Sequence, residues 1–296
     1  MATSTLTRSA EAAAPAGGLA RPDWRAKLFN RLCLGVLLAF AAIWIIPLAW
    51  AVDTAFKPEG ETTIAPVTWL IDRPNLEAFG KVLGGTEILN WYVNSAITST
   101  LIAATTVVFA SMAGFALSRV PLRARSIWFW FILAGIMVPS QALIVPLFRE
   151  FNAAHLLNTY WSVVLPQVPL AIAVFVFKQF FDGLPDELVD AAHVDGASWL
   201  RVYLRIFMPL SIPAISAVTI FTFVWSWNNF LWPLIVLTST PTMTLTVGLA
   251  TVQSDIGIAY AQIMASAVLG LLPLLTVFLL FQRRIVEGIA GTGLKG

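Results

Sequence analysis

The sequence predicts an all-α integral membrane protein with about six transmembrane helices and both termini in the cytoplasm. Of its 296 residues, 58% are hydrophobic and only 11% are charged, and the mean hydropathy of +0.80 exceeds that of soluble globular domains. The apolar residues also gather in runs long enough to cross a hydrocarbon core of about 30 Å at about 1.5 Å per residue. These runs cover residues 32–52, 91–117, 126–148, 157–177, 209–237 and 261–282.

The distribution of basic residues indicates how these helices are oriented, because cationic side chains prefer the cytoplasmic ends of transmembrane helices. If the N-terminus is cytoplasmic, only Lys57, Arg73, Lys81 and Arg149 lie outside, which leaves 14 of the 18 basic residues inside. The acidic residues divide about evenly between the two sides. Both termini are therefore expected in the cytoplasm.

The uncharged stretch between Phe207 and Ser254 fits either one helix with an apolar outer loop or two helices. A seventh helix would place Arg283 and Arg284 outside, against the charge bias. Thr238-Ser239-Thr240-Pro241 is also a favourable turn sequence. Six helices are therefore favoured.

The segments at the start of the chain are expected to be simple. Residues 1–24, rich in Ala, Ser, Thr and Gly, predict a disordered cytoplasmic tail, and residues 53–90 predict an outside loop with six acidic residues. The first run ends in Ala49-Trp50-Ala51, as at a signal-peptidase site, but it is longer than a signal core and follows about 30 polar residues, so a retained helix is expected. Cys33, the single cysteine, predicts ordinary packing.

The sequence lacks the groups that catalysis or ion coupling requires. It contains no Gly-x-x-x-x-Gly-Lys-Ser/Thr motif, so ATP hydrolysis is not expected in this chain. No metal-binding or nucleophile motif occurs, and His155 and His193 are assigned to opposite sides of the membrane, so no catalytic residue and no metal site is predicted. The interiors of the six runs have no ionisable residue of the kind that ion-coupled transporters use. An external energy source is therefore expected.

One polar segment, residues 182–208, interrupts the apolar pattern between the fourth and fifth runs. Pro185 suits the first turn of a helix, Gly196 can end it in the left-handed conformation, and Ser198 can cap a second helix. Ala191 and Ala192 would leave a shallow surface on which a partner can seat closely. In the second helix, one face would carry Trp199, Val202, Tyr203 and Ile206, and another face Arg201 and Arg205.

Asp190-Ala191-Ala192, followed by Gly196, Ile206 and Pro209, resembles the "EAA" loop by which ABC importer permeases dock on their ATPase. Because of this resemblance we call residues 182–208 the coupling loop. Asp190 stands where Glu is usual, and Met208 where Leu is common. Other segments are similar to the carbohydrate-uptake, MalG-like, binding-protein-dependent permeases with the MetI/MalG-like fold. They are Phe56-Lys57-Pro58, Pro74 to Phe79, Asn94-Ser95, Trp225 to Leu234, Gln282 to Gly288 and Gly293 to Gly296.

This resemblance implies a permease transmembrane domain over residues 25–296 in a bacterial plasma membrane. It implies a second MalF-like permease, an ABC ATPase dimer, an extracytoplasmic solute-binding protein and membrane lipid as partners, and no nucleic acid. ATP and Mg would bind the ATPase, and this chain would carry no cofactor. The residues implied to dock on the ATPase are Asp190, Ala191, Ala192, Asp195, Gly196, Ala197 and Arg201.

The substrate pathway is expected along the fifth helix. Trp225, Asn228, Asn229 and Trp232 recur at i, i+3, i+4 and i+7, which would place indoles and amides on one stripe, and sugars bind through such a mixture. An interfacial aromatic belt or helix packing is the alternative, above all for Trp232. Further candidates are Gln141 and Asn94. The MalF-like partner could hold most of the sugar.

The predicted function is a permease subunit of an ATP-driven importer for a sugar or oligosaccharide. Import of a polyol or a glycerol-phosphate-type solute remains open, although the absence of cations from the helix interiors favours a neutral saccharide. A membrane-embedded enzyme would need convergent ionisable residues, and none are found. A passive channel would not need the coupling loop.

Overall fold

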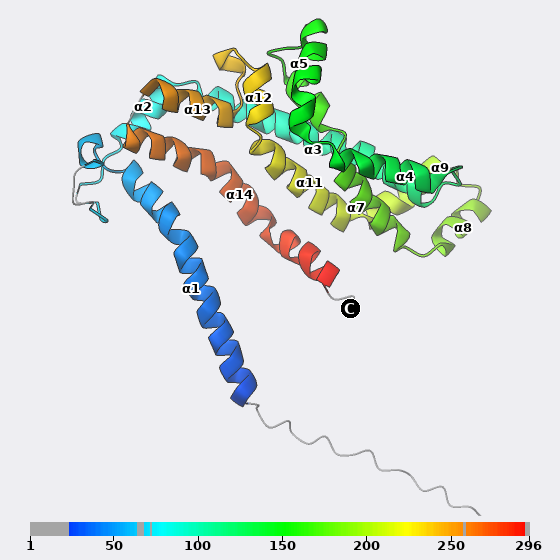
Figure 1. The fold of residues 1–296 in the computed structure, drawn as a ribbon. Coiled ribbons are helices and arrows are strands. Elements are labelled where there is room, and N and C mark those ends of the chain that lie inside the picture. The colour runs from blue at the N-terminus through cyan, green and yellow to red at the C-terminus, as the bar shows by residue number, and fades with distance from the viewer. Residues whose placement is uncertain (1–23, 64–67, 72, 257–258, 294–296) are drawn as a thin grey trace, which may run out of the picture. The chain divides into compact units, whose positions relative to one another are not determined.

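The computed structural model describes residues 24–63, 68–71, 73–256 and 259–293, and all regular elements in these residues are helical (Figure 1). The chain divides into two compact units, residues 1–50 and 51–296. The first unit contains most of α1 (Trp24–Ala55), whose side chains from Lys27 onward are largely exposed. The predicted tail, up to residue 23, lies outside the described residues.

The second unit consists of helices of unequal length with short 3-10 and π-helical turns. In chain order they are η1 (Glu59–Glu61), α2 (Glu77–Gly85), α3 (Ile88–Ser118), α4 (Arg125–Ala134), η2 (Gly135–Met137), η3 (Ser140–Leu143), α5 (Ile144–Ala153), α6 (Tyr160–Val164), η4 (Leu165–Gln167), α7 (Ala171–Asp182), α8 (Glu187–Val194), α9 (Trp199–Val202), η5 (Tyr203–Phe207), α10 (Met208–Leu210), α11 (Ile212–Trp227), α12 (Leu231–Val236), η6 (Thr240–Thr242), α13 (Leu245–Ile256) and α14 (Tyr260–Gly293).

Among the described residues, three single helices are long and apolar enough to cross a membrane, and up to six spans result if each bent pair of helices forms one span. The single helices are Lys27–Ala55, Ile88–Ser118 and Tyr260–Leu279. The bent pairs are Arg125–Met137 with Ser140–Ala153 at 88°, Tyr160–Gln167 with Ala171–Asp182 at 47°, and Trp199–Leu210 with Ile212–Trp227 at 77°. The apolar runs at 126–148 and 157–177 are therefore each broken into two helices.

Prolines account for the breaks. Proline lacks a backbone N–H and clashes with the carbonyl four residues earlier. Pro139 and Pro169 lie at the first two breaks, and Pro213 follows the third within two residues. Hydropathy predicts where the apolar segments lie, but it does not predict these bends, which change the direction of the chain within or before an apolar segment.

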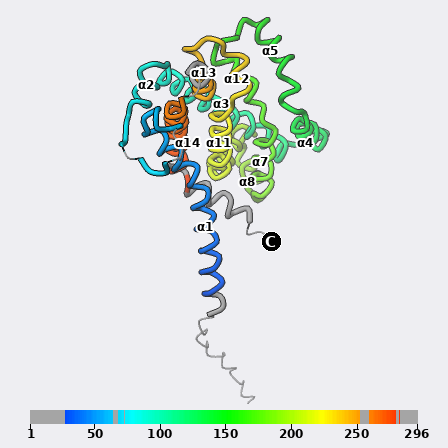
Figure 2. The backbone as a smooth tube through the Cα atoms, turned by 60° about the vertical axis from the view of Figure 1, so that its left-hand side comes forward, coloured from blue at the N-terminus to red at the C-terminus, as the bar shows by residue number. Residues whose placement is uncertain are grey.

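α3 lies at the centre of the second unit, where it packs against α7 and α11 (Figure 2). The helix buries hydroxyl residues along much of its length, and several of them bond to backbone carbonyls; Thr98 Oγ1, for example, donates to Asn94 O at 2.8 Å. Such bonds satisfy a buried hydroxyl without a partner helix. Serine and threonine side chains can therefore lie buried along α3, although the helix is apolar overall.

Candidate functional site

The coupling loop forms the predicted pair of helices. α8 ends before Gly196, whose φ of +73° is the left-handed conformation expected there. Two local predictions are wrong: Pro185 precedes α8 instead of lying in its first turn, and the Ser198 side chain makes no cap bond. The backbone carbonyl of Ser198 instead accepts from Val202 N at 3.0 Å. The second helix continues from α9 into the π-helical turn η5.

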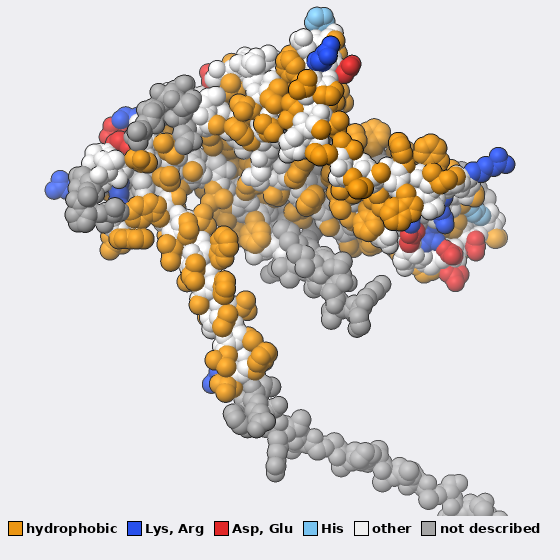
Figure 3. All heavy atoms as spheres, viewed as in Figure 1, with side chains coloured by type: hydrophobic (Ala, Val, Ile, Leu, Met, Phe, Trp, Pro, Cys, Tyr) orange, Lys and Arg blue, Asp and Glu red, His pale blue; other side chains and the backbone are white. Residues whose placement is uncertain are grey.

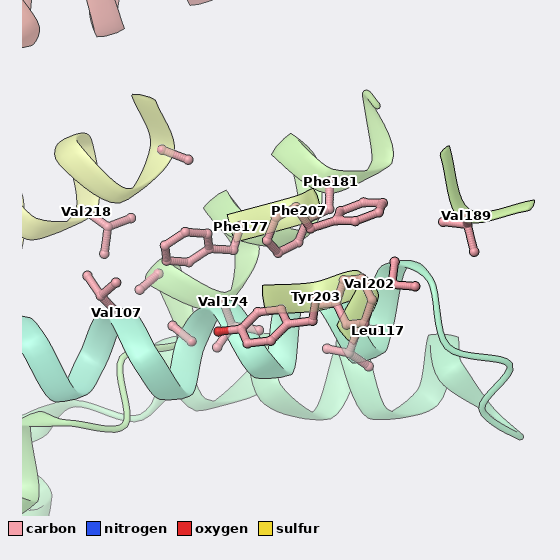
Figure 4. Close-up of a cluster of buried hydrophobic side chains, with 14 of the residues drawn as sticks. Val107, Leu117, Val174, Phe177, Phe181, Val189, Val202, Tyr203, Phe207 and Val218 are labelled. Carbon is pink, nitrogen blue, oxygen red and sulfur yellow. The ribbon is translucent and has the colours of Figure 1, made fainter. Parts of the chain in front are cut away.

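An aromatic core fixes this second helix to α3 and α7, as Figure 4 shows. The ring of Phe207 lies 5.0 Å from that of Phe115 on α3 and 5.5 Å from that of Phe181 on α7, measured between centroids. The hydroxyl of Tyr203 lies 2.8 Å from Ser111 Oγ of α3. The predicted apolar face is confirmed, because Val202 and Tyr203 are buried and Trp199 and Ile206 pack beside them. Since η5 carries this face, the loop is part of the helical core.

The residues expected to face an ATPase are mostly exposed. They are Asp190, Ala191, Asp195, Gly196 and Arg201, with Ala197 partly buried. The predicted docking surface is wrong for Ala192, because this residue is buried in the chain's own core and cannot form an open surface with Ala191. Charged side chains gather around α8 in Figure 3.

Sequence reasoning missed the apolar part of this surface. Val194 is 88% exposed, and Leu200 and Leu204 are also exposed. Val194 follows Asp190 by four residues and Ala191 by three, so all three share one face of α8. That spacing was a signal available in the sequence. The exposed face of α8 therefore carries an apolar residue flanked by carboxylates.

Polar contacts connect the ends of the helices beside the coupling loop. Ser118 Oγ of α3 donates to Asp182 Oδ1 of α7 at 2.6 Å, and Lys178 Nζ lies 2.6 Å from Asp182 Oδ2. Arg125 Nη1 of α4 donates to the backbone carbonyl of Ser118 at 2.7 Å. Three helices are thus joined at one end of the second unit. Arg119 adds further contacts, described below.

A second feature, a pocket of about 970 Å³, lies between α5, α11 and the segments around them. Its lining is mostly apolar, with a few amides and the indoles of Trp225 and Trp232, and the described residues that line it include no ionisable side chain. The lining residues are Ser140, Gln141, Leu143, Ile144, Leu147, Pro166, Gln167, Ala217, Ile220, Phe221, Val224, Trp225, Asn228, Asn229, Phe230, Leu231 and Trp232. The four residues predicted on the fifth helix, and Gln141, all belong to this pocket.

The predicted helical stripe is nevertheless wrong in its geometry. α11 ends at Trp227 and α12 begins at Leu231, so the two asparagines lie in the break between them. Pro233 explains the break, because its ring would clash with the carbonyl of Asn229 in a continuous helix. Because of this break, the amides of Asn228 and Asn229 line the pocket from a non-helical turn and not from one face of a continuous helix.

The amides and indoles of the pocket differ in their contacts. Asn229 Nδ2 donates to Gln167 Oε1 at 2.8 Å, and Gln167 was not predicted. Asn228 is exposed, and its Nδ2 donates to Val224 O at 2.8 Å. Trp225 is exposed, whereas Trp232 is buried and its Nε1 donates to Ser162 O at 2.8 Å. For Trp232 the structure therefore supports helix packing, the alternative to a substrate contact.

Asn94, the remaining substrate candidate, lies outside the pocket lining and has a structural role. It is 4% exposed, and its Nδ2 donates to Pro241 O at 2.8 Å and to Met243 O at 2.9 Å. Its Oδ1 accepts from the Tyr160 hydroxyl at 2.8 Å. Because both ends of the amide are engaged, the predicted contact with substrate is replaced by a contact that fixes the segment before α13.

Among the described residues, no group of three or more His, Cys, Asp or Glu side chains comes together in a way that could hold a metal ion. The polar chemistry of the pocket is instead that of uncharged amides and an indole. Such groups donate and accept hydrogen bonds without proton transfer, and an exposed indole offers a flat apolar face. The site is suited to binding and release of a solute.

Similarity to known proteins agrees with this geometry. The family described as "Binding-protein-dependent transport system inner membrane component" matches residues 106–291. The arabinooligosaccharides transport system permease protein AraQ of Halalkalibacterium halodurans is 36% identical over 88% of this chain and 93% of its own length. The sn-glycerol-3-phosphate transport system permease protein UgpE of Salmonella typhi is 30% identical over 87% of this chain and 93% of its own length.

A solved structure shows the same fold. It is a chain of a bacterial ABC transporter involved in the import of the acidic polysaccharide alginate, with a TM-score of 0.76 and 19% sequence identity. The match covers 87% of this chain and 96% of the other. The two chains thus share one fold. On the family match and the relatives together, this chain belongs to the binding-protein-dependent transport system inner membrane components, the permease subunits of ABC importers.

Proposed function

We propose that this permease carries a neutral sugar or oligosaccharide, and that the pocket between α5 and α11 is its half of the translocation pathway. The observation that carries the proposal is the pocket lining, in which the indole of Trp225 meets the amides of Gln141, Gln167, Asn228 and Asn229, and no ionisable side chain of the described part of the chain takes part. Hydroxyl groups of a sugar pair with amides, and its C–H faces stack on an indole. The volume lies within the range of ligand pockets, about 300–1,000 Å³.

The coupling loop is proposed to seat in a separate ABC ATPase dimer, which binds ATP and Mg. The exposed face of α8, with Asp190, Ala191 and Val194, supplies an apolar knob beside a carboxylate. Asp195, Gly196 and Arg201 continue the surface around the turn, with Ala197 partly covered. A second permease would cover the open side of the pocket, and a solute-binding protein outside the membrane would deliver the sugar.

The proposed topology has six spans in a bacterial inner membrane, within a permease domain at residues 25–296. We assign the fifth span to α11 with α12, because α9 and η5 belong to the coupling loop and carry Arg201 and Arg205. α11 alone, with 16 residues, extends about 24 Å at 1.5 Å per residue, so α12 completes the crossing. The charge bias supports a cytoplasmic location for both termini and for α8.

A glycerol-phosphate solute is the second candidate, because one relative with 30% identity is an sn-glycerol-3-phosphate permease. A phosphate group is usually held by Arg or Lys, and no such residue lines the pocket. The geometry therefore favours the sugar.

Uptake by the reconstituted importer tests the proposal. Proteoliposomes that contain both permeases, the ATPase and the binding protein should accumulate labelled arabinooligosaccharide in the presence of ATP, and labelled glycerol 3-phosphate should not compete. Competition by glycerol 3-phosphate at similar concentration would transfer the assignment to the second candidate. Vesicles without ATP serve as the control for passive leakage.

A further inference from the structure

Arg119 makes an unusual set of contacts for a residue in a short connection between helices. It directly follows α3, and its side chain is only 7% exposed. Its Nη1 forms an ion pair with Asp186, the residue before α8. Its Nη2 donates to the backbone carbonyls of Phe181 and Leu184. One guanidinium thus joins the end of α3 to the segment that leads from α7 to α8.

The same guanidinium also reaches the far end of the coupling loop. Its central carbon lies 5.4 Å from the centroid of the Phe207 ring, a cation–π contact, and Phe207 closes η5. Asp186 and Phe207 are 21 positions apart in the chain, near the two ends of the coupling loop. Arg119 is therefore in contact with both ends of the loop from a fixed position on α3.

Magnitudes indicate which of these contacts matters most. Asp186 is 85% exposed, and an ion pair with a solvated partner contributes only about 0–1 kcal/mol. The two carbonyl bonds come from a nearly buried cation, and bonds to charged groups are stronger than neutral ones. They also lie at the C-terminal end of α7, where the helix dipole favours a positive charge. The backbone contacts should therefore dominate over the pair with Asp186.

We infer that Arg119 is a positioning residue that locks the coupling loop to α3, so that a force applied to α8 moves α3 with it. This rests on the proposed docking of α8 on an ATPase. Without this contact, α8 would be held to the core mainly through its buried Val189 and Ala192, and it could tilt relative to α3 and the pocket walls. ATP would then be hydrolysed with little solute movement.

Spin-label distances test the lock itself, and they do not depend on any ATPase. Labels at Val93→Cys on α3 and Glu187→Cys on α8, both at exposed positions, report how α8 is held relative to α3 in the full chain with Cys33→Ser. A narrow distance distribution is expected with Arg119 present, and a broad one in Arg119→Ala. Asp186→Asn should broaden it less, because the carbonyl contacts remain. Arg123→Ala, which removes an exposed arginine from the same connection, should leave it narrow.

The assembled importer gives the functional test. In Arg119→Ala, solute imported per ATP hydrolysed should fall about tenfold, the effect of losing roughly 1.4 kcal/mol of charge-assisted bonding. Arg119→Lys should recover part of the ratio, because it keeps the charge but not the planar fork. Equal loss of import and hydrolysis would mean that Arg119 only supports assembly, and a narrow distribution in Arg119→Ala would also overturn the inference.

The two proposals fail in different ways. If the docking of α8 is wrong, Asp190→Lys will retain the ATPase, whatever the spin labels report. If only the lock is wrong, Asp190→Lys will lose the ATPase while Arg119→Ala leaves both the distance distribution and the coupling ratio unchanged. All variants are compared as monodisperse protein of equal amount, so that a variant that fails to fold is not mistaken for one in which ATP hydrolysis is uncoupled from solute import.

Discussion

Gly114 of α3 lies directly against Phe177 of α7. A Cβ atom added at Gly114 would stand 2.8 Å from the Cβ of Phe177 and 2.9 Å from the backbone nitrogen of Lys178. These separations are below van der Waals contact, so the two backbones approach closely only because glycine has no side chain. The approach holds α7 in place, and α7 leads into the coupling loop.

Gly114→Ala should therefore destabilise the permease. The added methyl group meets backbone, which cannot move aside as a flexible side chain would, and overpacking of this kind costs about 1–3 kcal/mol. The melting temperature of the detergent-solubilised protein should fall. Gly80→Ala in α2 is the control, because nothing lies within 4 Å of its added Cβ; equal melting temperatures for the two variants would contradict the close approach.

Gly248→Ala should lower the free energy of unfolding more than Gly114→Ala, and the size of the loss should depend on Trp91. The added Cβ would fall 2.1 Å from Trp91 Cδ2, and the indole also donates through Nε1 to Thr240 O at 2.7 Å. Displacing the indole would break this bond as well as the packing. In a Trp91→Ala background the same change should cost much less, a non-additivity that a double-mutant cycle of unfolding free energies will measure. Additive effects would show that the two residues do not oppose each other.

Asn229→Ala should reduce sugar import while ATPase subunits remain bound. The change removes a pocket amide and leaves Gln167 Oε1 without its donor, and loss of one such group typically costs about 1–3 kcal/mol, or roughly five- to 150-fold. Initial uptake rates at several sugar concentrations provide the measurement. Asn90→Ala, which removes an exposed amide at the start of α3, is the matched control. The pathway assignment fails if both variants import alike.

Asn94→Ala should lower the stability of the permease and leave its interaction with the sugar unchanged, unlike Asn229→Ala. Its amide holds the carbonyls of Pro241 and Met243 and the hydroxyl of Tyr160, so its loss leaves buried groups without partners. Thermal stability should drop, and the molecules that remain assembled should show an unchanged KM for the sugar. A raised KM with normal stability would restore the substrate role that the sequence predicted.

Asp190→Lys and Gly196→Val should each prevent co-purification of the ATPase while the permease stays in the membrane. The first reverses a charge on the exposed face of α8. The second forces a β-branched residue into a left-handed conformation, at φ +73°, that costs about 1–2 kcal/mol or more. Glu150→Lys, an exposed charge reversal on α5, should have no such effect. Recovery of an active complex from both variants would exclude the docking role.

The sequence predicted the coupling loop well, because its signals are local. Gly196 lies where a helix must turn, and the period of Val202, Tyr203 and Ile206 is that of a buried helical face. Local patterns failed at Ala192, which looked like surface beside Ala191 but faces the aromatic core. The small size of an alanine does not indicate whether its side of a short helix is covered by another helix.

The sequence by itself determined the composition, the apolar segments and the loop that resembles a known coupling element, since hydropathy and motif spacing are properties of consecutive residues. Tertiary structure decided how proline breaks redirect those segments, and that Asn229 faces Gln167 while Asn94 faces Pro241. It also decided that Arg119, which the sequence marks only as one more cytoplasmic charge, meets Asp186 across 67 positions. Such partners are fixed by the packing of α3 against α7 and α11, and packing depends on distant residues that no local window contains.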